Sequence, residues 1–261
     1  MKNFNFKKSL GQNFLTDNNI IEKIIKESDI EPKSLIIEIG PGAGALTKKL
    51  VLTSNQVVAF EIDTRLKDIL SQIKSDKLEI IYEDFLKVDL TKYLKKYKYS
   101  KLYVIANLPY YITTPIITKL INQVKPDSIT IMVQKEVGDR INAKTDSKNY
   151  NSLSIFSQYN YNIRKICDVS KNVFIPKPNV DSIVLNFKKI DRNIKVKNED
   201  KFFQFVRDSF QYKRKNLRNN LKKYDLKKLE EILKKYNKDL SFRAEQITIE
   251  EFINIFNDYE I

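Results

Sequence analysis

The feature that most constrains the fold is a regular alternation of apolar, β-branched runs with helical runs between residues 18 and 134. The runs predicted as strands are 34–40, 56–63, 77–85, 101–106 and 128–134. The runs with helical spacing are 18–30, 44–52, 64–74 and 114–124, the first capped by Asp17 or Asn18. Strands alternating with helices of about ten residues indicate right-handed βαβ units. We therefore predict an α/β fold with a mainly parallel, Rossmann-like sheet.

The alternation ends near residue 150, and the chain then changes character. A helix and two strands over 152–190 are expected to close the sheet as an antiparallel hairpin around "FIPKPN". Beyond Asp191 the pattern is helical over 199–224, 226–236 and 248–259, the last behind a Thr248 and Glu251 capping box. We predict one domain over 1–190 and a small all-α domain over 191–261.

The absence of His and the single cysteine limit the available chemistry. Without imidazole, the usual general base and most transition-metal sites are excluded, which leaves a carboxylate-only site for a hard cation as the one easy metal option. We predict no metal. Cys167 alone forms no internal disulfide, which suits a reducing compartment. No apolar run approaches the about 18 residues of a membrane helix, and the N-terminus lacks a signal-peptide core. We expect a cytoplasmic protein without membrane association.

The net charge of +14 comes from 47 Lys and Arg against 33 Asp and Glu. Such an excess is typical of proteins that bind polyanions, nucleic acid above all. The alternative is that a Lys-rich composition serves solubility alone.

A glycine-rich turn follows the first strand in "EIGPGAGALT" and opens a helix. Gly40, Gly42 and Gly44 would let the backbone pass close beneath a ligand. Their G-x-G-x-G spacing differs from that of dinucleotide binders, and no Lys follows as in a P-loop. Phosphates are therefore not the evident target, and an NAD-dependent enzyme is disfavoured.

Carboxylates end the next two strands. Glu61 is placed to accept both hydroxyls of a ribose, and Asp84 to accept from an adenine amino group. Either acid alone is better explained as an ordinary solvated loop charge. Because the carboxyl ends of parallel strands share one crevice, the glycines and both acids together predict one pocket. An adenosine-bearing cofactor without phosphates, S-adenosylmethionine, fits this set better than NAD.

The fourth strand runs into "NLPY", which by itself could be a simple turn. The side-chain oxygen of Asn107 and a backbone carbonyl of the loop fixed by Pro109 could accept both hydrogens of an exocyclic amine. These acceptors would localise the nitrogen lone pair and aim it at a methyl group. Tyr110 would stack on the base, a contact worth ~1–3 kcal/mol.

Collinear segments through nearly the whole chain resemble the KsgA-type small-subunit ribosomal RNA adenine-N6 dimethyltransferases, whose fold is a class I methyltransferase domain with a small helical C-terminal domain. The matching segments are "KKSLGQNFLTD", "IIEIGPGAGALT", "VVAFEID", "EDFL", "IANLPYYITTPII", "MVQKEVGDRI", "NYNSLSIFSQ", "FIPKPNVDS" and "FQYKRKNLRNNL". The resemblance implies cofactor contacts at Asn13, Leu15, Gly40, Gly42, Glu61, Asp84 and Asn107.

The resemblance also implies the residues that hold the substrate. Asn107 and Tyr110 would address the target adenine, and Phe174 would form a second aromatic wall for one unpaired base. Without the family, Phe174 reads as a core residue before a proline turn. Leu10 stands where members often carry Phe, and Tyr111 where Asn is common.

A basic run in the helical tail is similar to the family's RNA-contacting region. Its cations are Lys213, Arg214, Lys215, Arg218, Lys222 and Lys223, with no acid between them. A charge run is usually a solvated face, but here we favour contact with the RNA backbone.

The resemblance implies a monomeric enzyme that transfers four methyl groups, two to each of two adjacent adenosines near the 3′ end of 16S rRNA in the 30S subunit, with a role in subunit biogenesis. Two alternatives remain open. One is a macrolide-resistance type of 23S rRNA methyltransferase, from which Leu108 and the "FIPKPNVDS" segment lean away. The other is a non-catalytic assembly factor, against which the intact Glu61, Asp84 and NLPY loop argue.

Overall fold

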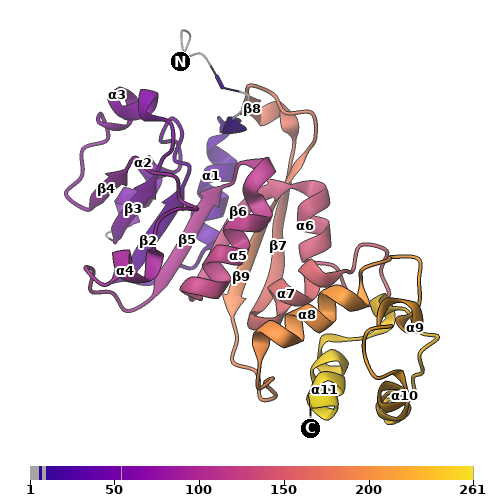
Figure 1. Ribbon diagram of the computed structural model, residues 1–261. Coiled ribbons are helices and arrows are strands. Elements are labelled where there is room, and N and C mark those ends of the chain that lie inside the picture. The colour runs from indigo at the N-terminus through magenta and orange to yellow at the C-terminus, as the bar shows by residue number, and fades with distance from the viewer. Residues whose placement is uncertain (1–5, 8–9, 54, 261) are drawn as a thin grey trace. The chain divides into compact units, whose positions relative to one another are not determined.

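A seven-stranded sheet organises the first of two units in the computed structural model, which describes residues 6–7, 10–53 and 55–260 (Figure 1). The strands are β2 (Leu35–Ile39), β3 (Gln56–Phe60), β4 (Leu78–Ile81), β5 (Leu102–Asn107), β6 (Ser128–Gln134), β7 (Tyr161–Val169) and β9 (Ser182–Lys189). Their order is β4-β3-β2-β5-β6-β9-β7. The strands from β4 to β6 pair in parallel and β9 runs antiparallel to β6, which confirms the predicted fold class.

Helices cover the sheet because its strands are apolar on both faces. All five residues of β2 are buried, as expected for a central parallel strand. The helices of this unit are α1 (Asn18–Glu27), α2 (Thr47–Leu50), α3 (Lys67–Leu70), α4 (Leu90–Leu94) and α5 (Thr113–Gln123). Ile21 and Ile24 of α1 pack in one cluster with Ile36 and Tyr103 of the sheet. Asp17 caps α1 as predicted, accepting from the backbone N–H groups of Asn19 and Ile20.

A second, two-stranded sheet joins distant parts of the chain. In it β1 (Phe14–Leu15) pairs antiparallel with β8 (Phe174–Ile175), so that Leu15 lies opposite Phe174. As expected, β7 and β9 are neighbours in the large sheet, and the "FIPKPN" segment lies in the connection between them. That connection contains β8, which pairs with the N-terminal segment.

The second unit is helical. It contains α7 (Ser152–Asn160), α8 (Glu199–Ser209), α9 (Leu217–Asn220), α10 (Leu226–Lys234) and α11 (Ile249–Glu260), while α6 (Lys135–Ile141) passes from one unit into the other. Thr248 and Glu251 form the predicted capping box, each side chain bonding the other's backbone N–H.

The helix predicted over 199–224 is wrong in its middle. The chain leaves helical conformation after Ser209 and resumes it only at Leu217. The buried amide of Asn220 holds this break, because it donates to Ser209 O at 2.7 Å and accepts from Tyr212 N at 3.0 Å. Such a tertiary contact has no local periodic signal.

The unit boundaries also differ from the expected division at 190. The first unit comprises Met1–Gly138 and Asn162–Lys189, and the second comprises Asp139–Tyr161 and Ile190–Ile261. The first unit ends at Lys189, one residue before the division expected after residue 190. The segment Asp139–Tyr161 belongs with the C-terminal helices because its Ile155 and Tyr159 are buried in the same core as Phe202.

Glu38 on β2 provides a pH-dependent element of stability. Its side chain is buried, Oε2 has no hydrogen-bond partner among the described residues, and burial raises its pKa from 4.5 to about 8. At pH values between 4.5 and about 8, Glu38 therefore keeps its proton in the folded protein, whereas the unfolded chain has lost it. Stability contributed by this proton is complete below the unfolded pKa and is lost as pH rises through the folded pKa.

Replacing Glu38 by Gln is expected to raise Tm over wild type, with a gain that is small at about pH 5 and largest at about pH 8.5. The amide has nearly the same shape and carries no proton to lose. Thermal unfolding at both pH values measures the gain. Glu22→Gln, on an exposed side chain, is the control, and a Glu38→Gln gain that does not change with pH would contradict the assignment.

Candidate active site

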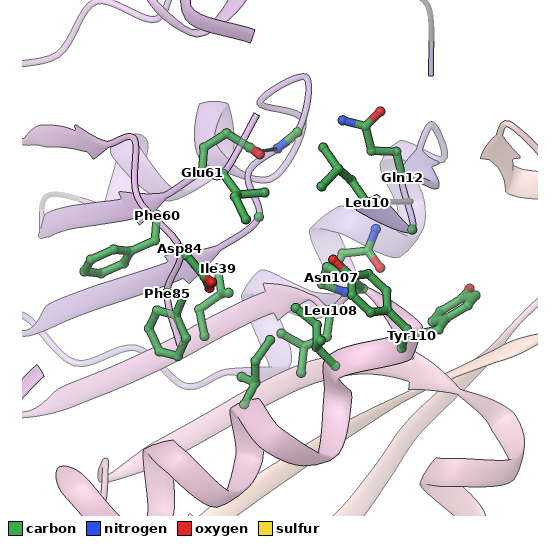
Figure 2. A pocket seen from close by; sticks show the side chains of 18 of the residues that line it. Leu10, Gln12, Ile39, Phe60, Glu61, Asp84, Phe85, Asn107, Leu108 and Tyr110 are labelled. Carbon is green, nitrogen blue, oxygen red and sulfur yellow. Dashed lines mark hydrogen bonds between the residues drawn. The ribbon is translucent and has the colours of Figure 1, made fainter. Parts of the chain in front are cut away.

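A cavity of about 180 Å³ lies at the carboxyl ends of β2, β3 and β5 (Figure 2). This volume is more than ten times the space that one water needs, so it accommodates a ligand. The residues that line it come from the ends of β2, β3, β4 and β5 and the loops after them, from residues 10–14 and from α5: Leu10, Gly11, Gln12, Asn13, Phe14, Ile39, Gly40, Gly42, Phe60, Glu61, Ile62, Glu83, Asp84, Phe85, Leu86, Asn107, Leu108, Pro109, Tyr110, Tyr111, Ile112 and Ile116.

The glycine turn after β2 forms the floor of this cavity. Gly40 and Gly42 have φ of 70° and 57°, a region that side chains rarely adopt. A Cβ on Gly42 would stand 2.8 Å from the ring of Phe14, whereas a Cβ on Gly40 would meet only Asn107 O, at 3.9 Å. Gly42 is thus required by protein packing. Gly40 leaves open space, which suits close approach of a ligand to the backbone.

Glu61 follows β3 and is fixed by the backbone. Oε2 accepts from Gly42 N at 3.0 Å and Oε1 from Asp63 N at 2.8 Å, although the residue is only 5% exposed (Figure 2). Burial raises its pKa, and these two donors oppose that rise. Each carboxylate oxygen retains a second lone pair, so Glu61 can accept from two further donors in a fixed direction.

Asp84 lies beyond β4 in a loop that two contacts hold. Its Oδ1 accepts from Leu86 N at 3.0 Å. Lys119 of α5 donates to the carbonyls of Leu86 and Val88, at 2.8 and 2.5 Å. Partial burial lowers the pKa of Lys119, and the charge of Asp84 counters this. The two hydrogen bonds of Lys119 therefore fix the loop that contains Asp84 to α5.

Asn107 ends β5, and its amide is oriented by the N-terminal segment. Its Nδ2 donates to Asn13 O at 2.9 Å. With the amino group committed, Oδ1 is the atom that remains to accept, and it has no partner among the described residues. Asn13 is held in turn by donating from Nδ2 to Gly11 O at 3.2 Å.

The loop after Asn107 leaves one backbone carbonyl available. Pro109 O accepts from Ile112 N and from Thr113 Oγ1. Leu108 donates its N–H to Met132 O, while no donor to its own carbonyl is found in the described part of the chain. The backbone acceptor expected in this loop is therefore Leu108 O, and Pro109 contributes the turn, with φ of −59°.

Tyr110 is anchored at its hydroxyl, 2.7 Å from Ser182 Oγ. Burial raises its pKa, so it is neutral and its ring is held in place at the cavity wall.

Two of the predicted residues lie in the core instead of the cavity wall. Leu15 and Phe174 are 5% and 2% exposed, and both belong to the apolar cluster under α1. The pairing of β1 with β8 directs both side chains inward. Cofactor contact by Leu15 and base contact by Phe174, as expected from the resemblance, are not supported by this arrangement.

A hydrogen bond that no sequence pattern indicated joins the N-terminal segment to the residues that follow β3. Gln12 Nε2 donates to Asp63 Oδ2 at 2.7 Å, and Arg65 forms an ion pair with the same carboxylate at 2.5 Å. Arg65 holds the pKa of Asp63 down to about 2. An acid two residues after Glu61 was visible in the sequence, but its partner Gln12 lies 51 positions away.

The six cations of the basic run are exposed in the second unit. Arg218 pairs with Glu230 at 3.1 Å and Lys223 with Asp208 at 2.8 Å. The other four form no ion pair with any described residue, namely Lys213, Arg214, Lys215 and Lys222.

These features fit S-adenosylmethionine as the cofactor. Open space above Gly40 and acceptor carboxylates at Glu61 and Asp84 suit an adenosine. Among the described residues that line the cavity, no Lys or Arg is present to receive a phosphate. Within the described residues there is no cluster of three or more His, Cys, Asp or Glu able to hold a metal ion. Nor does that part of the chain contain a helix able to span a membrane.

Comparisons with known proteins identify the family of this chain. The model of the ribosomal RNA adenine dimethylase family matches residues 3–260. The chain is 42% identical to the ribosomal RNA small subunit methyltransferase A of Oceanobacillus iheyensis, covering 98% of this chain and 91% of the relative. It is 44% identical to the protein of that name from Staphylococcus carnosus, covering 98% and 90%.

Solved structures give the same result. A dimethyladenosine transferase from Plasmodium falciparum superimposes with a TM-score of 0.78 and 25% identity, over 95% of this chain and 98% of that one. The 23S rRNA methyltransferase ErmE shares the fold, with a TM-score of 0.73 and 21% identity over 95% and 100%. The chain belongs to the ribosomal RNA adenine dimethylase family.

Proposed function

We propose that this enzyme, an S-adenosylmethionine-dependent rRNA adenine dimethyltransferase, acts on two adjacent adenosines near the 3′ end of 16S rRNA in the 30S subunit. It would place two methyl groups on N6 of each. The observation that carries the proposal is the pair of unused acceptors, Asn107 Oδ1 and Leu108 O, in the same cavity as Glu61 and Asp84. The two small-subunit relatives support the choice of rRNA.

The acceptor pair addresses the main obstacle in this reaction. An adenine amino group is a poor nucleophile because its lone pair is delocalised into the ring. In the first transfer, Asn107 Oδ1 and Leu108 O accept from its two hydrogens, which favours a pyramidal nitrogen and exposes the lone pair. The monomethylated nitrogen has one hydrogen, so the second transfer uses one of the two acceptors. In each transfer the S–C bond breaks as the N–C bond forms, and the nitrogen then releases one proton to water. Because both acceptors are fixed by protein hydrogen bonds, little reorganisation accompanies the reaction.

The remaining residues bind and orient. S-adenosylmethionine supplies a methyl group on a positively charged sulfur, so its neutral thioether leaves readily. Glu61 would accept hydrogen bonds from the ribose hydroxyls of the cofactor, and Asp84 from its adenine amino group. Gly40 has no side chain, so the cofactor can approach the backbone closely. Tyr110 stacks on the target base. No strong base is required at the site, in keeping with a chain that has no His.

The exposed cations of the second unit are proposed to contact the RNA backbone. Replacing Lys213 and Arg214 together by Gln is expected to weaken binding to rRNA and to reduce the slope of log K against log salt by about 2, because two phosphates are no longer neutralised. Titrations at several salt concentrations measure the slope. Lys223→Gln, whose cation already pairs with Asp208, is the matched control and should change the slope less. An unchanged slope in the double variant would refute the proposed role of these cations.

The direct test is transfer of tritiated methyl groups to under-methylated 30S particles, with 50S particles and free 16S rRNA as parallel substrates. Mass spectrometry of the product should find two dimethylated neighbouring adenosines. Transfer to 50S particles alone would assign the enzyme to the other subunit, and no transfer to any of the three would refute the proposal.

We further propose that the enzyme is a cytoplasmic monomer with a role in small-subunit biogenesis. Its single cysteine suits a reducing compartment, and its positive charge suits a partner made largely of RNA.

A further inference from the structure

Tyr111 is an exposed aromatic residue at the wall of the active-site cavity. Its relative exposure is 56%, although the cavity that it lines also contains Asn107 and Tyr110. Tyr110 differs because its hydroxyl is bonded to Ser182. The hydroxyl of Tyr111 has no hydrogen-bond partner among the described residues, so the ring is not placed there by a polar contact.

The ring nevertheless lies close against Gly11, where a side chain would have no room. A Cβ on Gly11 would stand 3.0 Å from Cδ1 and Cε1 of Tyr111 and 3.5 Å from Cβ of Pro109. Gly11 has φ of 60°, so glycine is favoured there for both conformation and space. One side of the Tyr111 ring is thus supported by the backbone of Gly11, and much of the rest faces solvent.

An exposed ring beside the cavity that takes the target adenine is placed to stack on a neighbouring base. When one adenine leaves its stack to enter the pocket, the neighbouring base loses a stacking surface. An aromatic side chain beside the pocket restores it, and base–aromatic stacking is worth ~1–3 kcal/mol. Any base has the required π face, so this contact favours an unpaired flanking nucleotide of any identity.

We infer that Tyr111 is a second base-binding subsite, which stacks the nucleotide flanking the target adenosine. The inference rests on the proposed function, because it needs a nucleobase in the cavity. It makes Tyr111 a binding residue for RNA with no part in holding the cofactor. Two adjacent target adenosines would then occupy the pocket and the Tyr111 platform in turn.

The test compares the aromatic face with simple apolar bulk. Tyr111→Phe keeps the ring, Tyr111→Leu keeps apolar bulk without it, and Tyr111→Ala removes both. Fluorescence anisotropy, with S-adenosylhomocysteine present, gives Kd for a short single-stranded RNA containing two adjacent adenosines. The same RNA with an abasic site beside the target adenosine is the partner substrate. Tyr99→Ala, a tyrosine 38% exposed before β5, is the control.

The abasic site should weaken binding about 5- to 150-fold for wild type, Tyr111→Phe and Tyr99→Ala, the range that corresponds to removal of stacking on one base. The abasic site should weaken RNA binding by Tyr111→Leu and Tyr111→Ala only slightly, because these variants have no aromatic ring for the flanking base to stack on. The KM for under-methylated 30S particles should rise in the Leu and Ala variants by a similar factor. The Kd for S-adenosylmethionine, by calorimetry, should stay within about twofold.

The inference is overturned if the abasic site weakens RNA binding equally in wild type and Tyr111→Ala. It is also overturned if the abasic site does not change the Kd of the wild type. A loss of cofactor affinity in Tyr111→Ala as large as its loss of RNA affinity overturns it as well. The proposed function can fail separately from the subsite. If the wild-type enzyme shows the ring-dependent loss of affinity but methylates no ribosomal particle, the Tyr111 subsite is supported and the proposed reaction is refuted.

Discussion

Asn107→Ala is expected to lower kcat on the order of 10³-fold, with a much smaller change in the Kd for S-adenosylmethionine. The substitution removes one of the two acceptors that localise the lone pair of the adenine nitrogen. Single-turnover methyl transfer to under-methylated 30S particles measures the rate, and calorimetry measures cofactor binding.

Two further variants separate the acceptor from its orientation. Asn107→Asp keeps oxygen acceptors but loses the N–H bond to Asn13 O, so its rate should lie between wild type and the Ala variant. Asn19→Ala, on the exposed side of α1, should behave as wild type. An Ala variant with more than about a tenth of the wild-type rate would show that Asn107 is not the acceptor that matters.

Glu61→Ala is expected to weaken S-adenosylmethionine binding about 100-fold, the second largest effect. It removes acceptors for two ribose hydroxyls and leaves the buried N–H groups of Gly42 and Asp63 without their acceptor, each at a cost of ~1–3 kcal/mol. The glycine turn should therefore loosen as well. Calorimetric titration gives the affinity, and thermal unfolding without cofactor gives the loss of stability.

Glu61→Gln tests the geometry further. An amide has one oxygen, so it cannot accept from both N–H groups, and we expect only partial recovery of affinity. Glu22→Ala removes an exposed carboxylate and should leave cofactor binding unchanged. If Glu61→Ala bound the cofactor as tightly as Glu22→Ala, the ribose would have to be held elsewhere.

The parts of the fold that the sequence predicted well are those set by neighbouring residues. The β-branched runs gave every parallel strand, and Asp17 and Thr248 were recognisable caps because capping acts over about three residues. The ends of parallel strands share one edge, so Glu61, Asp84 and Asn107 could be assigned to one cavity before any contact was known.

What could not be predicted depends on contacts between distant residues. The inward direction of Leu15 and Phe174 follows from a strand pair formed across more than 150 positions. The occupied carbonyl of Pro109 is a local exception, because its donors Ile112 N and Thr113 Oγ1 lie only three and four residues further along the chain. The interruption before α9 depends on one buried amide, Asn220. None of these has a periodic pattern in the sequence.

The chain passes between its two units at 138, 161 and 189, and this limits how the enzyme can be divided. A fragment that stops at residue 190 would retain α7 with the apolar side chains of Ile155 and Tyr159 but would lose Phe202, which shares their core. That fragment would expose apolar surface and tend to aggregate. Shuffling of catalytic and helical modules among relatives would therefore require exchanging both helical segments together.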